Sequence, residues 1–145
     1  MLTRSRPDPS EYPAFYAGYV ERAPGDAWHT ALEAADTAFH HLLTTVPETL
    51  GEHRYAPGKW SLKEVVLHVI DSERIFAYRA LRFARQDDTA LSGFDENTYV
   101  PASGAHRRTL ADLHTEHDAV RAASWALFRN LDADAWSRSG MANGR

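Results

Sequence analysis

The sequence contains no cysteine. Disulfide bridges, thiolate metal sites and cysteine nucleophiles are therefore excluded, and the 8 histidines and the carboxylates remain as candidate metal ligands. No stretch comes near the roughly 18 consecutive apolar residues of a membrane-spanning helix. The first ten residues, MLTRSRPDPS, carry two arginines but no apolar segment behind them, so a secretory signal is not expected. The sequence thus predicts a cytoplasmic protein without a membrane partner.

Several other signals are also missing. A net charge of −4 at pH 7 argues against a dedicated nucleic-acid-binding protein. The sequence has no glycine-rich phosphate loop, no GxSxG, no HExxH and no EF-hand loop. It also shows no internal repeat and no alternation of apolar and polar residues of the kind that strands have. The predicted fold class is therefore all-α.

What the sequence does contain is the apolar periodicity of helices in one small domain. A chain of 145 residues has room for a single core. Residues 1–10 carry two prolines and no periodic apolar positions, so they are predicted to form a flexible tail in front of a helical domain at residues 11–145. Aromatic residues at helical spacing over 12–20 predict a short leading helix that ends before Pro24.

Three longer amphipathic helices follow. The first is predicted to start after Asp26, a good N-cap residue, and to run to about Thr45; the second runs from Ser61 to about Arg85, and the third starts after Thr109. The predicted core positions are, in chain order, Trp28, Leu32, Ala35, Phe39, Leu42 and Val46; Val65, Val69, Phe76, Ala80 and Phe83; and Leu110, Leu113, His117, Val120, Ser124, Leu127 and Leu131.

The second long helix has the clearest start. The Ser61 hydroxyl can accept a hydrogen bond from the amide of Glu64, and the Glu64 carboxylate can accept one from the amide of Ser61, which together make a capping box. The capping box explains why a glutamate stands at position 64 without a metal ion. Residues 86–108 are predicted to form a long connection and residues 132–136 a last helical turn. The pattern is that of an up-down bundle without its last helix.

His68 is the first candidate for chemistry. It lies in the middle of the second long helix, with Asp71 three residues further on. Its spacing fits two interpretations. His68 is either a buried neutral histidine whose ring nitrogens bond to protein groups, or a metal ligand with a carboxylate close by to orient it. One histidine cannot hold a metal ion by itself.

His114 and His117 form a local pair with ligand spacing. Residues at i and i+3 of a helix can chelate a metal ion, but a core histidine beside a solvated one explains the same pattern. The histidines expected at the surface are His29, His53 and at least one of His40 and His41.

Longer ordered strings carry a family resemblance. The run from Tyr55 to Arg74, YAPGKWSLKEVVLHVIDSER, continues through IFAYRALRFARQD and the loop GFDENTYV. Together with the aromatic segment near the start and the terminal DADAWSRSGMANG, these strings closely resemble the DinB/YfiT-like family of metalloenzymes. The resemblance covers roughly residues 11–145.

The resemblance implies a four-helix bundle in which three histidines hold a divalent metal such as Zn²⁺ or Ni²⁺. One of these histidines is on the second helix and two are in an HxxxH motif on the last. His68, in His-Val-Ile-Asp, matches the first ligand. The other two have no counterpart, because the sequence ends at Arg145, where the family's connection into its last helix begins. Relatives that use low-molecular-weight bacterial thiols imply a small-molecule or thiol substrate.

Two hypotheses follow. The first is a metal-dependent hydrolase or thiol S-transferase with His68 as a ligand in an incomplete site. The second is a non-catalytic helical module that forms homodimers through the surface that the last helix of the bundle covers. Such pairing could also bring His114 or His117 toward His68 as a substitute ligand. The side chains expected on that surface are Phe76, Phe83, Val120 and Leu127.

Overall fold

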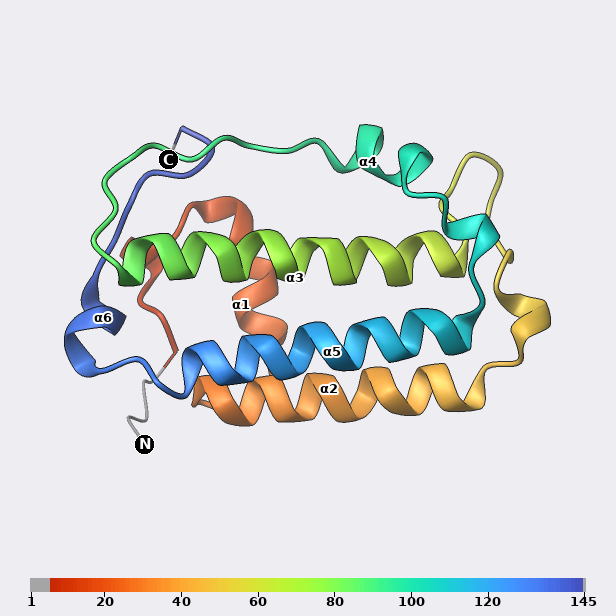
Figure 1. Ribbon diagram of the computed structural model, residues 1–145, viewed down its shortest axis with the longest axis horizontal. Helices are drawn as coiled ribbons and strands as arrows, with labels where there is room; N and C mark the ends of the chain where they lie inside the picture. The colour runs from red at the N-terminus through yellow and green to blue at the C-terminus, as the bar shows by residue number, and fades with distance from the viewer. Residues whose placement is uncertain (1–5, 145) are drawn as a thin grey trace.

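The computed structural model describes residues 6–144, and this part of the chain is built from helices. Three long helices, α2 (Trp28–Thr45), α3 (Leu62–Ala84) and α5 (Leu110–Phe128), run side by side, with α5 packed against both of the others (Figure 1). No strand occurs among the described residues, which confirms the all-α prediction. The shorter elements are the 3-10 turns η1 (Pro9–Glu11) and η2 (Ala14–Tyr16), α1 (Ala17–Arg22), the 3-10 turn η3 (Glu48–Leu50), α4 (Glu96–Ala102), the 3-10 turn η4 (Ala105–Arg107) and α6 (Ala133–Ser137).

The N-terminal segment is held against α1. Residues 1–5 of the predicted tail lie outside the described residues, but from residue 6 onward contacts are present. The Arg6 guanidinium donates hydrogen bonds to the carbonyl oxygens of Val20 and Ala23. The predicted leading helix over 12–20 is broken up, because Pro13 has extended backbone and the regular α-helix begins only at α1.

Local hydrogen bonds fix the starts of α3 and α5 as predicted. Ser61 Oγ accepts from the amide of Glu64 at 3.3 Å, and Glu64 Oε2 accepts from the amide of Ser61 at 2.7 Å, so the capping box is confirmed. Thr109 Oγ1 accepts from the amide of Asp112 at 3.0 Å. Arg54 also donates to both Glu64 oxygens and holds the pKa of that carboxyl below its usual range. Glu64 therefore has a structural role at the start of α3.

The predicted cap of α2 is wrong. The residue before α2 is Ala27, whose methyl group cannot accept a hydrogen bond, and no side chain caps this end. The carboxylate of Asp26 lies instead 3.5 Å from the Arg6 guanidinium. Asp26 is thus one residue too early to cap the helix and serves the N-terminal segment.

The core lies where α2, α3 and α5 meet near the η4 end of the bundle. Its buried members are Leu43, Val66, Leu67, Ile70, Ala105, Leu110 and Leu113. The predicted inner face of α3 was wrong in part: Val65 and Phe76 are 42% and 45% exposed. Because α3 carries apolar residues on several sides, its sequence pattern does not single out the face that packs against α5.

The inner face of α2 follows the prediction at Phe39 and Val46, which pack against the core, and departs from it at two other positions. Leu43 is buried, whereas Leu42 is 38% exposed. Asp36 is half-buried, whereas Ala35 is exposed. A polar residue takes this inner position because Asp36 faces a buried arginine of α5, described below. No helix within residues 6–144 is long and apolar enough to span a membrane.

Candidate functional site

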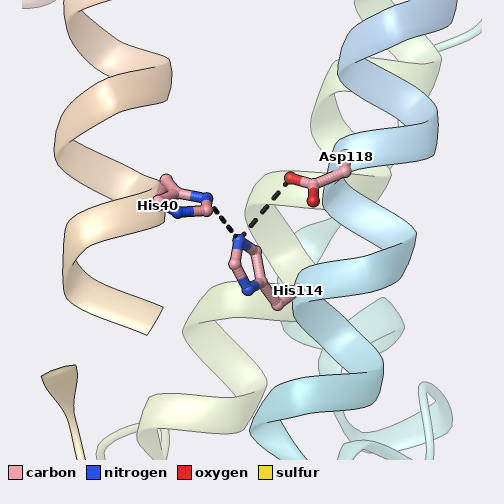
Figure 2. A group of neighbouring side chains, drawn as sticks. All are labelled: His40, His114 and Asp118. Atoms are coloured by element: carbon pink, nitrogen blue, oxygen red, sulfur yellow. Dashed lines mark hydrogen bonds and ion pairs between the residues drawn. The ribbon is translucent and has the colours of Figure 1, made fainter. Parts of the chain in front are cut away.

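Three side chains of metal-binding type meet between α2 and α5 (Figure 2). His40 extends from α2, and His114 and Asp118 extend from α5 toward it. The His114 Nε2 atom lies 2.8 Å from Nδ1 of His40 and 3.6 Å from Oδ1 of Asp118. All three ligand atoms lie within 4.8 Å of one another. We call these residues the α2–α5 cluster; its two imidazoles and one carboxylate are a donor set that Zn²⁺ takes in proteins.

Helical spacing builds this cluster. His114 and Asp118 are four residues apart on α5, so their side chains lie one above the other on the face that meets α2. The His114 side chain is 17% exposed and the Asp118 side chain 57% exposed. His40 is exposed. The cluster is therefore held between two helices and remains accessible to solvent.

Asp118 differs from other carboxylates of the helix interfaces in its partners. Its Oδ1 lies 3.6 Å from a ring nitrogen of His114 and 3.6 Å from a ring nitrogen of His117, and no Lys or Arg nitrogen forms an ion pair with it among the described residues. By contrast, Asp71 and Glu73 each face an arginine. Among the described residues, the ion-pair partners of the Asp118 carboxylate are thus imidazoles.

His117 lies behind Asp118 in the interior. Its side chain is 1% exposed, and its ring packs on Phe39 with centroids 4.4 Å apart. Neither ring nitrogen has a hydrogen-bond partner within residues 6–144, although Nδ1 is 3.6 Å from Asp118 Oδ1 and 4.0 Å from Asp36 Oδ1. Burial, together with the positive charge of Arg121, lowers the pKa of His117. His117 is thus a neutral core histidine.

Arg121 crosses the interior one turn further along α5. Its side chain is 10% exposed, and its Nη2 lies 2.9 Å from Oε2 of Glu73 on α3 while its Nε lies 3.8 Å from Oδ1 of Asp36 on α2. These ion pairs join all three long helices. The sequence prediction did not include Arg121 among the core positions.

His68 lies on α3 and is half-buried. Its ring packs against the indole of Trp60 with centroids 5.0 Å apart. One turn away, burial raises the pKa of Asp71, an effect that the nearby Arg74 opposes and the negative charge of Glu116 supports. Arg74 joins these carboxylates, 3.4 Å from Asp71 and 2.5 Å from Glu116 of α5. His68 therefore borders a polar cluster that links α3 to α5.

An apolar groove of about 500 Å³ continues from this polar cluster along α3 and α5. Arg74 lies at the end of the groove nearer to His68. Tyr78 and Leu81, which line it, are 51% and 37% exposed. The lining residues are Arg74, Ala77, Tyr78, Leu81, Ala119, Val120, Ala123, Ser124 and Leu127. On α5, helical geometry puts this groove and the α2–α5 cluster on opposite sides of the helix.

Two of the four residues predicted for an uncovered face lie in this groove. Val120 and Leu127 are lining residues, but Phe76 and Phe83 belong to the other side of α3. Phe76 is 6.5 Å from Tyr16, centroid to centroid, and Phe83 contacts the chain at Gly140. Phe76 is still 45% exposed, but it and Phe83 do not join the groove, because N- and C-terminal segments lie against that side of α3.

The histidines predicted as candidate ligands lie in different environments in the structure. His114 and His117 do not act as a local pair, because His117 enters the core while His114 turns to α2. His40, one of two adjacent histidines of which the sequence placed at least one at the surface, is the partner of His114. The signal for it was weak: His40 follows Phe39, a residue on the inner edge of α2. Its pairing depends on how α2 and α5 are rotated against each other, and sequence spacing within one helix does not contain that information.

Comparison with known proteins agrees with the architecture. The family model of the DinB superfamily matches residues 31–145. No curated protein matches the chain. A solved structure, YfiT from Bacillus subtilis, is similar with a TM-score of 0.68 and 18% sequence identity, covering 78% of this chain and 65% of that one. YfiT is described as a probable metal-dependent hydrolase with an unusual four-helix bundle topology, and the likeness shows that this chain has the same fold.

The resemblance of the sequence to DinB/YfiT-like proteins is thus confirmed at two levels. The matched residues 31–145 include all three long helices, and the fold match covers most of the chain. The chain spans 65% of the length of YfiT. From the extent of the family match, this chain belongs to the DinB superfamily.

Proposed function

We propose that the protein is a metal-dependent enzyme of the hydrolase class, with His68 as one ligand of a divalent metal such as Zn²⁺ or Ni²⁺. The observation that carries this proposal is the position of His68: a half-buried imidazole against Trp60, one turn from Asp71, in a chain of the DinB superfamily. The description of YfiT as a probable metal-dependent hydrolase supports the same class.

His68 can supply one of the ligands that such a site needs. Within residues 6–144, no group of three neighbouring ligating side chains includes it. Asp71 is close enough to interact electrostatically with His68 and offers a carboxylate beside it. Under this proposal, the remaining ligands come from outside the described residues.

The residues around His68 prepare the site for a small organic substrate. A bound divalent metal lowers the pKa of a water or thiol and so supplies a nucleophile at neutral pH. The Trp60 indole packs against the His68 ring at a tilt of 54°. Arg74 fixes the carboxylates of Asp71 and Glu116, and the groove beyond Arg74 offers apolar surface to a substrate. S-transfer from a low-molecular-weight thiol is the alternative reaction at the same site.

Metal content and activity of variants test the role of His68. Wild type, His68→Ala and the control His41→Ala, an exposed histidine of α2, are purified in parallel. Metal is measured by mass spectrometry, and activity on chromogenic esters and amides and in conjugation of a thiol to a chromogenic electrophile. His68→Ala should lose its metal at this site and about a hundredfold or more of the activity while keeping its helical circular dichroism. Equal metal content and activity in all three proteins would exclude His68 as a ligand.

The apolar groove favours a second candidate function. A non-catalytic helical module would use the exposed face of α3 and α5 to pair with a second copy of the chain. The two candidates differ in their metal content and their mass. Stoichiometric, chelator-sensitive metal that depends on His68 supports the enzyme. A well-folded dimer in which His68 holds no metal supports the module.

A further inference from the structure

The geometry points to a second metal site, the α2–α5 cluster of His40, His114 and Asp118, which binds a first-row transition metal of the Zn²⁺ type. This site lies across α5 from the groove next to His68, so it is independent of the function proposed above. The ion joins α2 to α5 with three protein ligands, which leaves a fourth position open to solvent.

The distances within the cluster fit a shared ion. Tetrahedral Zn²⁺ with bonds of about 2.0–2.1 Å places its ligand atoms roughly 3.3 Å apart. The observed separations from His114 Nε2 are 2.8 Å to His40 Nδ1 and 3.6 Å to Asp118 Oδ1, on either side of that value. The remaining separation, between the ligand atoms of His40 and Asp118, is within 4.8 Å, so rotation of these exposed side chains is what brings all three atoms to coordination distance. Two imidazoles also favour Zn²⁺, Co²⁺ or Ni²⁺ over Mg²⁺ and Ca²⁺, which prefer oxygen ligands.

The charges around the cluster also favour a cation. Asp118 has no arginine or lysine partner among the described residues, although neighbouring interface carboxylates do. The two rings of His40 and His114 approach to hydrogen-bond distance, which requires that at least one of them is neutral. A neutral imidazole is the form that binds a metal. A divalent ion can thus satisfy both rings and the carboxylate at once.

The buried residue His117 lies beside Asp118. His117 is 1% exposed, has no hydrogen-bond partner within the described residues, and directs Nδ1 toward Asp118 Oδ1 at 3.6 Å. A small shift lets this nitrogen donate a hydrogen bond to the carboxylate. Buried donors of this kind orient the carboxylate ligands of metal sites. An otherwise unexplained buried imidazole therefore has a role as a positioning residue for the cluster.

Cobalt titration tests the site directly, because tetrahedral Co²⁺ absorbs visible light and takes the same ligands as Zn²⁺. The protein is freed of metal with a chelator and titrated with CoCl₂, followed by competition with ZnCl₂. The variants are His40→Ala and Asp118→Asn, each at an exposed residue. The matched control is His41→Ala, the exposed neighbour of His40 on α2. His68→Ala separates this site from the one proposed above, and circular dichroism checks that every variant is folded.

Wild type, His41→Ala and His68→Ala should each show the visible Co²⁺ spectrum of the α2–α5 cluster, which Zn²⁺ removes, and His40→Ala and Asp118→Asn should weaken Co²⁺ binding at this cluster at least tenfold. Zn²⁺ should also raise the melting temperature of wild type but not of His40→Ala, because the ion joins two helices. The proposal is overturned if the wild type binds no Co²⁺, or if His68→Ala removes the spectrum while His40→Ala leaves it intact. The second result would assign the metal to the His68 side of α5.

Discussion

The carboxylate of Glu48 connects three elements at the scale of a single residue. Its Oε1 lies 2.7 Å from the ammonium of Lys63 on α3, and its Oε2 accepts a hydrogen bond of 2.7 Å from the amide of Leu110, the first residue of α5. This ammonium and amide lower the pKa of Glu48 below its usual value of 4.5, because both stabilise the charged form. The start of α5 thus depends on a charge supplied by η3.

The lowered pKa predicts how stability depends on pH. The unfolded chain binds the proton of Glu48 at a higher pH than the folded chain, so the stability from Glu48 is present above pH 4.5 and is lost as the pH falls through the folded pKa. Glu48→Gln should lower the melting temperature by a few degrees at pH 7. The difference from wild type should shrink as the pH falls below 4.5 and through the folded pKa of Glu48, where the carboxylate takes up its proton.

A neighbouring carboxylate provides the control for this prediction. Glu52 also faces Lys63, at 3.5 Å, and its side chain is 53% exposed. Glu52→Gln should therefore have a smaller effect that added salt removes. Thermal unfolding across this pH range measures all three proteins. A difference between wild type and Glu48→Gln that stays the same from pH 7 down to the lowest pH at which both proteins fold would refute the charged contact.

At the scale of the element, the capping box of α3 gives a stability prediction. Ser61 is 1% exposed and accepts from the amide of Glu64, so Ser61→Ala should cost about 1 kcal/mol of the free energy of unfolding. Urea denaturation measures the change, with Ser92→Ala at an exposed loop position as the control. Activity per folded molecule should stay the same. A Ser61→Ala protein as stable as the control would show that Glu64 and Arg54 hold the helix end without Ser61.

The elements also show which parts of the fold sequence patterns can predict. The starts of α3 and α5 were predicted because capping motifs such as Ser61 with Glu64 lie within four residues of one another. The inner face of α3 was not predicted correctly. Apolar residues lie on several sides of this helix, and its packing on α5 decides which side is buried. Asp36 was missed on α2 because its buried position depends on an arginine of another helix.

The candidate site residues likewise include some that the sequence indicates and some that it does not. His68 was singled out because it belongs to a continuous string that resembles the family, and its role as a ligand stays a prediction. The sequence could not predict that His40 pairs with His114. The two residues are 74 positions apart in the chain, and they come together only through the rotation of α2 against α5. Long-range polar contacts of this kind leave no periodic pattern in the sequence.

At the scale of the whole molecule, the apolar groove between α3 and α5 leaves apolar side chains exposed to solvent. Its residues Tyr78 and Leu81 are 51% and 37% exposed, although the flanking core is closed. Contiguous exposed apolar surface of this kind marks a contact site. A pair of chains related by a twofold axis would bury the groove of each copy against the other. The proposed homodimer would form through this contact between the two grooves.

A substitution that introduces a negative charge into the groove tests this pairing. Leu81→Glu should raise the dissociation constant of the dimer at least tenfold, because a carboxylate that loses its water without a partner costs several kcal/mol. Leu81 is already partly exposed in the single chain, so the stability of the folded monomer should change little. The control is Leu50→Glu on η3, a residue 46% exposed that does not line the groove. Sedimentation equilibrium over about 1–100 µM measures the masses. A wild-type protein that stays at 16.3 kDa throughout this range would contradict the homodimer, and the groove would then be free to take substrate or another segment.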